Sequence, residues 1–128
     1  MTQTITPYLL YEDAAAAMDF LGRAFGFEET MRMPAPDGRV GHAEMKLGDG
    51  QIMLGQPEAP TSPKRLGGTP VLMYIYIDGV DAHCERARGA GAEIAQEPRD
   101  EEYGDRTYHA RDPEGHSWYF AQRIAGDG

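Results

Sequence analysis

Apolar residues in the first half of the chain change from a helical to an alternating spacing. Between residues 14 and 25 they recur every three or four positions, which is typical of an amphipathic helix. From residue 39 to residue 47 apolar and polar side chains alternate, which predicts a strand with one buried face. The elements predicted for this half are a strand over 5–11, a helix over 14–25 ended by Gly26, and strands over 27–33, 39–47 and 51–55.

The second half repeats this order of elements. One constant offset, applied without gaps, places Asp13 on Asp78 and Gly26 on Gly91, so the helix starts and the helix ends coincide. The elements predicted here are a strand over 71–77, a helix capped by Asp78 or Asp81, a short strand over 92–95, an acidic loop over 96–105, and strands over 106–111 and 116–122.

A segment rich in turn-forming residues separates the two repeats. Residues 56–69 contain three prolines and two glycines, which favours a linker over a regular element. The chain of 128 residues is long enough for one domain, or for two small halves that share a core. We therefore predict a single domain over 1–128, with repeat one at about 5–55, this linker, and repeat two at about 70–123.

Composition and charge exclude several classes of protein. Hydrophobic residues are 41% and charged residues 26% of the chain, as in globular rather than disordered proteins. A net charge of −9 without a basic cluster makes nucleic acid and anionic membrane surfaces poor partners, and no apolar run is long enough to span a membrane. The single cysteine, Cys84, cannot form an internal disulfide, and residues 1–10 lack the pattern of a signal peptide. We therefore expect a cytoplasmic protein.

Two stretches carry a more specific signal. Residues 11–27 contain Tyr-Glu-Asp, Met-Asp-Phe-Leu and Arg-Ala-Phe-Gly-Phe, and residues 103–118 contain Tyr-Gly-Asp-Arg and Asp-Pro-Glu-Gly-His-Ser-Trp. Together with the repeat, they resemble the vicinal oxygen chelate superfamily, which includes glyoxalase I, methylmalonyl-CoA epimerase, extradiol dioxygenases and bleomycin-resistance proteins. The resemblance implies an α+β fold, in which tandem βαβββ repeats form an open, curled, mixed β-sheet barrel with a concave cleft for a ligand.

The resemblance also implies where a catalytic metal would bind. Enzymes of this superfamily usually hold a divalent ion with His, Glu or Gln from the first and last strands of each half. The matching positions in this chain are Thr6, Leu54, Leu72 (or Val71 in the neighbouring register) and Tyr119. Because these side chains cannot chelate a catalytic divalent ion together, we predict no bound metal and no cofactor.

Histidines offer a different site for chemistry. Alternation places His42 and Glu44 on the same face of one strand, and the repeat places His109 at the position equivalent to Glu44. These three side chains could bind a metal at a non-standard site, form an acid–base pair, or merely line a wet groove. His83 is expected on the solvent face of the second helix, and His116 is expected to order the last hairpin.

Aromatic residues suggest a binding surface. Four tyrosines are predicted by strand parity to face the concave side: Tyr8, Tyr74, Tyr76 and Tyr119. Flat rings with a hydroxyl suit the stacking and orienting of a small organic ligand; the alternative is that they fill the barrel. Trp118 and Phe120 have the opposite parity and are expected in the core. Arg106 is expected to form a salt bridge with Asp105 or Asp112, or to meet an anionic ligand.

The favoured function is the metal-free binding of a small, antibiotic-like organic molecule, cationic or neutral, by a homodimer. The alternative is a metal-dependent lyase, isomerase or dioxygenase of the superfamily that uses His42, Glu44 and His109, so whether the protein is an enzyme stays open. The predicted ligand-binding residues are Tyr8, His42, Glu44, Tyr74, Tyr76, Arg106, His109 and Tyr119.

Overall fold

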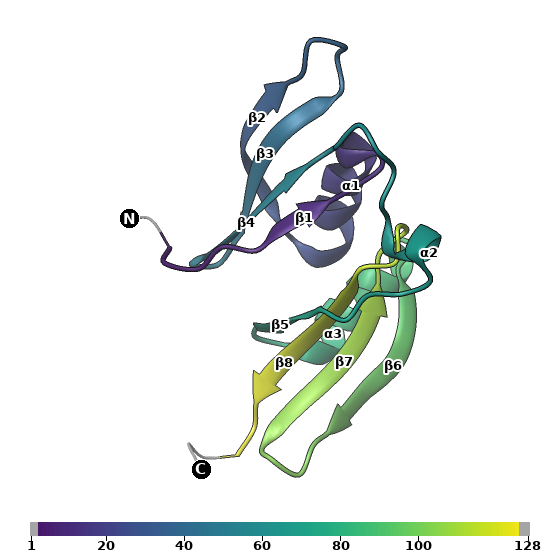
Figure 1. Ribbon diagram of the computed structural model, residues 1–128. Coiled ribbons are helices and arrows are strands. Elements are labelled where there is room, and N and C mark those ends of the chain that lie inside the picture. The colour runs from purple at the N-terminus through teal and green to yellow at the C-terminus, as the bar shows by residue number, and fades with distance from the viewer. Residues whose placement is uncertain (1–2, 126–128) are drawn as a thin grey trace.

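The computed structural model describes residues 3–125, which form two similar halves (Figure 1). The first half consists of β1 (Tyr8–Leu10), α1 (Ala14–Phe20), η1 (Leu21–Phe25), β2 (Glu28–Pro34), β3 (Val40–Leu47) and β4 (Gly50–Gly55). The second half consists of β5 (Leu72–Tyr76), α3 (Val80–Gly89), β6 (Glu93–Asp100), β7 (Asp105–Arg111) and β8 (Ser117–Arg123). The two halves therefore share the predicted strand–helix–three-strand order.

Each half forms a four-stranded mixed sheet. The strand order is β1-β4-β3-β2 in the first sheet and β5-β8-β7-β6 in the second. The first and last strands of each half pair in parallel, whereas the other pairs are antiparallel. Within residues 3–125 no strand of one sheet pairs with a strand of the other, so the fold is the predicted α+β arrangement without a closed barrel.

The first helix begins and ends where the sequence predicts. The carboxylate of Asp13 accepts a hydrogen bond of 3.0 Å from the backbone N–H of Ala16, which caps the helix start. α1 continues into η1, a wider π-helical turn, and stops at Gly26. Gly26 has a φ of 89°, the left-handed conformation that a residue without a side chain adopts most easily.

The prediction of the second helix cap is wrong. The N-cap of α3 is Gly79, with a φ of 66°, and neither Asp78 nor Asp81 caps the helix with its side chain. Asp81 lies in the first helical turn, and its carboxylate instead forms an ion pair of 2.9 Å with Arg106. The side chain of Asp81 therefore pairs with an arginine on the sheet instead of capping the helix, the role that local sequence rules predict for it.

The predicted acidic loop is also wrong in most of its length. β6 runs without interruption from Glu93 to Asp100, and only residues 101–104 connect it to β7. β6 is an edge strand, which tolerates Pro98 because one side of the strand needs no ladder partner. Its register against β7 is irregular on both sides of Gln96, and such bulges hide the alternation from a sequence reading.

The linker helps to hold the halves together. It contains a single helical turn, α2 (Pro63–Leu66). The guanidinium of Arg65 donates to the carboxylate of Glu12 over 2.8 Å and lowers the pKa of Glu12 to about 2. From the second half, the carboxylate of Glu114 accepts hydrogen bonds from the backbone N–H groups of Glu12 (2.6 Å) and Asp13 (2.8 Å). The start of α1 is thus tied both to the linker and to the last hairpin.

One hydrophobic core spans both halves. The ring of Phe25 in η1 lies 5.5 Å from the Trp118 ring and 4.8 Å from the Phe120 ring, measured between centroids. Trp118 and Phe120 are fully buried, as strand parity predicted. α3 also contacts η1, so both helices lie on the core side of their sheets. Within residues 3–125 no helix has the length and apolar character that crossing a membrane requires.

The expectation that His83 faces solvent is wrong. Its Nε2 bonds the backbone oxygen of Phe25 over 2.8 Å, and its Nδ1 bonds the hydroxyl of Tyr108. The carbonyl can only accept, so Nε2 carries the proton and Nδ1 accepts from Tyr108. Burial lowers the pKa of His83, which keeps the ring neutral. A histidine on the helix therefore joins the second half to the first.

Candidate functional site

The open face of the second sheet carries a row of aromatic side chains. Tyr74, Tyr119 and His109 lie opposite one another on β5, β8 and β7, because the strand register pairs Tyr74 with Tyr119 and Tyr119 with His109. The neighbouring residues Met73 and Ile75 pack against the core, so the tyrosines of β5 point the other way. We call Tyr74, Tyr76, Tyr119 and His109 the aromatic face.

The rings of the aromatic face are stacked. The rings of His109 and Tyr119 are 4.3 Å apart between centroids and only 9° from parallel. The rings of Tyr119 and Tyr74 are 6.2 Å apart and 14° from parallel. Tyr74 and Tyr76 remain 40% and 54% exposed, which is high for rings on a packed sheet. Tyr119 is therefore stacked between His109 and Tyr74, and a flat organic molecule could extend this row at one end.

The buried carboxylate of Asp105 fixes the rings of Tyr74 and Tyr76. The side chain of Asp105 accepts hydrogen bonds from the hydroxyls of Tyr74 (2.6 Å) and Tyr76 (2.8 Å), and the Arg123 guanidinium lies 3.2 Å from its other oxygen. Asp105 is only 1% exposed. The Tyr74 hydrogen bond leads the effects that lower the pKa of Asp105, and burial followed by this same bond raises the pKa of Tyr74. The carboxylate is therefore ionised and both phenols are neutral hydrogen-bond donors.

Asp105 is a site residue that the sequence reading missed. The sequence places it at the end of the expected acidic loop, within the Tyr-Gly-Asp-Arg stretch, and assigns it only a salt bridge with Arg106. Its spacing of two from Thr107 and four from His109 could have placed it on the open face of the same strand. The edge irregularities of β6 obscured where β7 begins.

His109 adds an unpaired polar atom to the aromatic face. Its Nε2 is buried and has no hydrogen-bond partner within residues 3–125. Burial is the main effect that lowers the pKa of His109, so the ring is neutral near pH 7. A neutral imidazole stacked on Tyr119 completes the row as a third flat ring.

The open face of the first sheet carries a hydrogen-bonded chain of side chains. The Tyr8 hydroxyl lies 2.9 Å from Nδ1 of His42, and Nε2 of His42 lies 3.0 Å from Oε2 of Glu44. The amide of Gln51 donates to Oε1 of Glu44 over 2.9 Å. Alternation correctly places His42 and Glu44 on one face of β3, whereas Gln51 reaches them from the adjacent strand β4 and Tyr8 from β1, on the far side of β4.

The remaining candidate, Arg106, does not lie with the tyrosines. Its guanidinium is held by Asp81 on α3 and by Asp100 on β6, each at 2.9 Å. Arg106 thus forms a salt bridge, but both predicted partners are wrong. The carboxylate of Asp105 lies 3.2 Å from the Arg123 guanidinium instead, and Asp112 accepts from Tyr11 and Trp118. His116 donates from Nε2 to the backbone oxygen of Leu10 over 3.0 Å, with Asp112 accepting from its backbone N–H, so it orders the last hairpin.

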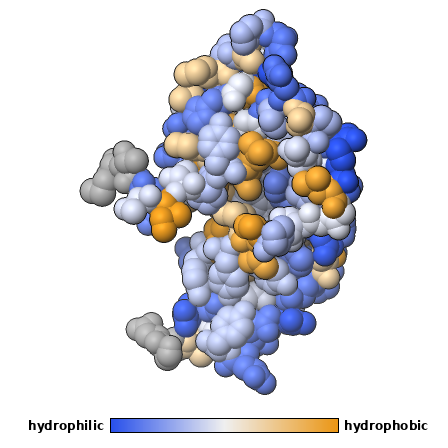
Figure 2. Space-filling model, in the orientation of Figure 1, coloured by the Kyte–Doolittle hydropathy of each residue, from blue (hydrophilic) through white to orange (hydrophobic). Residues whose placement is uncertain are grey.

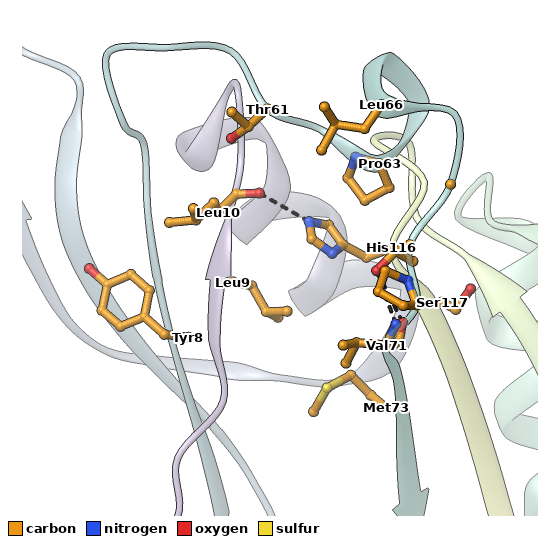
Figure 3. Close-up of a pocket in the computed structure, with 13 residues that line it drawn as sticks. Tyr8, Leu9, Leu10, Thr61, Pro63, Leu66, Val71, Met73, His116 and Ser117 are labelled. Carbon is orange, nitrogen blue, oxygen red and sulfur yellow. Dashed lines mark hydrogen bonds between the residues drawn. The ribbon is translucent and has the colours of Figure 1, made fainter.

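An apolar groove lies at the waist between the halves, where hydrophobic side chains gather at the surface (Figure 2). Its volume is about 280 Å³, and it is lined mainly by β1, the linker and the start of β5. Leu9 points into this groove while its neighbour Tyr8 points away (Figure 3). The ring nitrogen of His116 that faces Leu10 is already bonded, so the groove offers mostly apolar contacts. Its size is at the lower limit for a ligand pocket.

The donor atoms available for a metal are sparse. Within residues 3–125 no group of three His, Cys, Asp or Glu side chains is placed to hold an ion, and His109 does not join His42 and Glu44. Leu54, one of the four positions matched to the metal ligands of the superfamily, does not face the open side of the sheet as the sequence predicts. It is fully buried on the core side. Its neighbour Met53 pairs with Tyr8 and is the residue that faces outward.

Comparisons with known proteins agree with this fold. A sequence model of the Glyoxalase/Bleomycin resistance protein/Dioxygenase superfamily matches residues 4–120. TioX from Micromonospora sp. ML1 has a similar crystal structure, with 35% sequence identity, a TM-score of 0.79, and coverage of 96% of this chain and 100% of TioX. The uncharacterized protein Mb0911c of Mycobacterium bovis is 37% identical over 94% of this chain and 83% of its own length.

A more distant relative shares the fold alone. The crystal structure of a glyoxalase/bleomycin resistance protein/dioxygenase from Nocardioides is 22% identical, with a TM-score of 0.72 and coverage of 98% of this chain and 87% of that one. The chain belongs to the Glyoxalase/Bleomycin resistance protein/Dioxygenase superfamily.

Proposed function

We propose that this protein binds a small, flat organic molecule of the antibiotic-like kind on its aromatic face, without a metal ion. The observation that carries the proposal is the stacked row of Tyr74, Tyr119 and His109 on an exposed sheet face. Asp105 holds the hydroxyls of Tyr74 and Tyr76, so little freedom of these side chains would be lost when a ligand adds to the Tyr74 end of the row.

Charge narrows the proposed ligand to neutral or cationic molecules. The chain has a net charge of −9, which disfavours the approach of phosphorylated or carboxylated compounds. A positive charge over a tyrosine ring gains a cation–π interaction, as Arg123 already does 5.7 Å from the centre of the Tyr76 ring. A planar cation could compete for the same ring.

We propose that the binding unit is a homodimer. Each sheet supplies only one wall of a cleft, and exposed apolar side chains lie along β5, including Leu72 at 50% exposure. A second copy would cover part of this surface and supply an opposite wall. Light scattering after size-exclusion chromatography should give twice the chain mass of 14.1 kDa at micromolar concentration. A monomer under these conditions would refute the dimer.

We also propose that the protein acts in the cytoplasm. Its single cysteine, Cys84, is buried in α3, and burial raises the pKa of the thiol. Such a thiol neither forms an internal disulfide nor reacts readily, which fits a reducing compartment.

A thermal-shift screen with planar aromatic dyes of positive, zero and negative charge tests the binding proposal. Positive and neutral dyes should raise the melting temperature of the wild type, and Tyr74→Ala or Tyr119→Ala should weaken the shift. Tyr74→Phe keeps the ring and should retain most of it. Leu66→Ala, which changes an exposed apolar side chain on α2, is the matched control. Hits that are indifferent to both tyrosine variants would place the binding site elsewhere.

A further inference from the structure

The chain Tyr8–His42–Glu44 on the first sheet has the order of a proton relay. The two carboxylate oxygens of Glu44 take part in separate hydrogen bonds, with the amide of Gln51 (2.9 Å) and with Nε2 of His42 (3.0 Å). Nε2 of His42 therefore donates to Glu44, and in the neutral imidazole the lone pair of Nδ1 is free. In this tautomer Nδ1 accepts the hydroxyl proton of Tyr8 over 2.9 Å.

The backbone leaves room for the Tyr8 hydroxyl at this position. A side-chain carbon added at Gly55 of β4 would lie 2.9 Å from the Tyr8 oxygen and 2.8 Å from the carbonyl oxygen of Gly41. Only a glycine at this point of the strand lets the phenol reach His42. Tyr8 itself is 48% exposed, so its oxygen is open to a molecule on the sheet face.

The residues that pair with His42 and Glu44 on the adjacent strands are uncharged. Met53 on β4 and Met31 on β2 flank Glu44, and Met33 on β2 lies opposite His42. The next charged side chain on the same face of β3 is Lys46, whose ammonium group is 3.6 Å from Glu28. Glu44 is thus the anion placed to stabilise a positive charge on His42.

We propose that Tyr8 is a catalytic acid–base residue, activated by His42 and Glu44, for a bound organic molecule with an ionisable O–H or N–H group. In this step the ligand transfers its proton to the Tyr8 oxygen, and Tyr8 transfers its own proton to Nδ1 of His42. The imidazolium that forms is held by Glu44, so no proton is lost and no metal is needed. His42 and Glu44 are positioning residues, because neither needs to touch the ligand.

The relay is independent of the proposed binding on the aromatic face. Within residues 3–125 no hydrogen bond or ring contact connects Tyr8, His42 or Glu44 to Tyr74 or Tyr119. A failure of one proposal is therefore distinguishable from a failure of the other, since the variants that test the relay lie in the first half and those that test the aromatic face lie in the second.

Acetylation by N-acetylimidazole, followed by peptide mass spectrometry, measures the activation of Tyr8 directly. As the Tyr8 oxygen attacks the acetyl carbon, its proton passes to His42 and the bond from acetyl to imidazole breaks. The departing imidazolide takes a proton from water, and the hydroxide that forms removes the proton from His42. Tyr103 is more exposed, at 61%, and serves as the internal reference. Since a positioned general base accelerates such steps by about a hundredfold or more, Tyr8 should react at least about tenfold faster than Tyr103.

Variants of His42 and Glu44 test whether the relay causes the faster acetylation of Tyr8. His42→Gln should reduce the rate at Tyr8 to that of Tyr103, and Glu44→Gln should slow Tyr8 without changing Tyr103. Glu29→Gln, which breaks an exposed ion pair with Arg32 on β2, is the matched control and should leave both rates unchanged. Equal rates at Tyr8 and Tyr103 in the wild type, or a rate at Tyr8 that ignores His42→Gln, would overturn the proposal.

A second measurement needs no variant and so does not depend on folding of the mutants. Nitrogen-15 NMR of the wild-type imidazoles should find His42 with a proton on Nε2 and a bare Nδ1. The opposite tautomer as the major form would overturn the relay, because Nδ1 could not then accept the proton of Tyr8.

Discussion

The hydroxyl of Tyr11 donates a hydrogen bond of 2.6 Å to the carboxylate of Asp112, and both side chains are buried where the two halves meet. The same carboxylate accepts from the indole N–H of Trp118 at 3.1 Å and from the backbone N–H groups of Glu114 and His116. One aspartate of the last hairpin therefore satisfies donors from both repeats. Tyr11 is also a neutral donor, because burial, followed by the charge of Asp112, raises its pKa.

Removal of this acceptor should be strongly destabilising. Asp112→Ala leaves buried donors of Tyr11 and Trp118 without a partner, at a cost of about 1–3 kcal/mol for each group. We expect the free energy of unfolding in urea to fall by about 3 kcal/mol or more. Asp78→Ala, at an exposed position, should change it by less than about 0.5 kcal/mol. Similar values for the two variants would contradict the role of Asp112 at the junction.

Acid should weaken the contact that His83 makes between the halves. Burial lowers the pKa of His83 in the folded protein, so the unfolded chain binds its proton more readily than the fold does. Stability should therefore rise with pH through the window between the lowered folded pKa and the unfolded value of about 6.5, and fall as pH drops through it.

Urea titrations at several pH values between about 5 and 7.5 measure this effect, with the window set by the unfolded histidine. His83→Gln cannot take up a proton and should flatten the pH dependence, although it can also lower stability at every pH. His109 has a lowered pKa of the same origin and should account for part of the residual slope. An unchanged slope in His83→Gln would exclude His83 as the titrating group.

Two glycines should respond to alanine in opposite ways. At Gly55 the added methyl group meets backbone at 2.8 Å, and Gly55→Ala should destabilise the fold by about 1–3 kcal/mol. At Gly89 in α3 nothing lies within 4 Å, and Gly89→Ala should raise stability by about 0.5–1 kcal/mol through its helix propensity. Thermal unfolding of both variants provides the comparison, and a stabilising Gly55→Ala would show that the strand can shift there.

Loss of the buried carboxylate should loosen the aromatic face. Asp105→Ala removes the acceptor shared by Tyr74 and Tyr76, so their rings should gain rotational freedom and planar ligands should bind less tightly. We expect the affinity for a planar dye to fall by about fivefold, which corresponds to about 1 kcal/mol. Asp100→Ala, at the outer end of β6, should leave it unchanged. Equal binding by Asp105→Ala and the wild type would mean that the rings need no anchor.

Much of the fold follows from local patterns in the sequence. The helix stripe, the cap at Asp13 and the left-handed Gly26 depend on neighbouring residues, which explains why the first half was predicted closely. β6 was missed because an edge strand with bulges and a proline lacks the alternation that identifies a strand.

The candidate site, like the fold, could be predicted from the sequence only in part. Parity along a strand correctly places Tyr74, Tyr76 and Tyr119 on the open face, since it needs only the strand itself. The anchoring by Asp105, the contact of His83 with Phe25 and the reach of Tyr8 to His42 each join segments distant in sequence. Such contacts depend on tertiary packing, which spacing alone does not encode.

Isothermal titration calorimetry of the strongest planar dye, with and without EDTA, tests most directly whether the aromatic face binds a ligand without a metal. The wild type should bind with the same affinity in both buffers, and Tyr119→Ala should weaken binding by at least about tenfold, or 1.4 kcal/mol. Binding that disappears with EDTA, or that is equally strong in Tyr119→Ala, would contradict the proposed function.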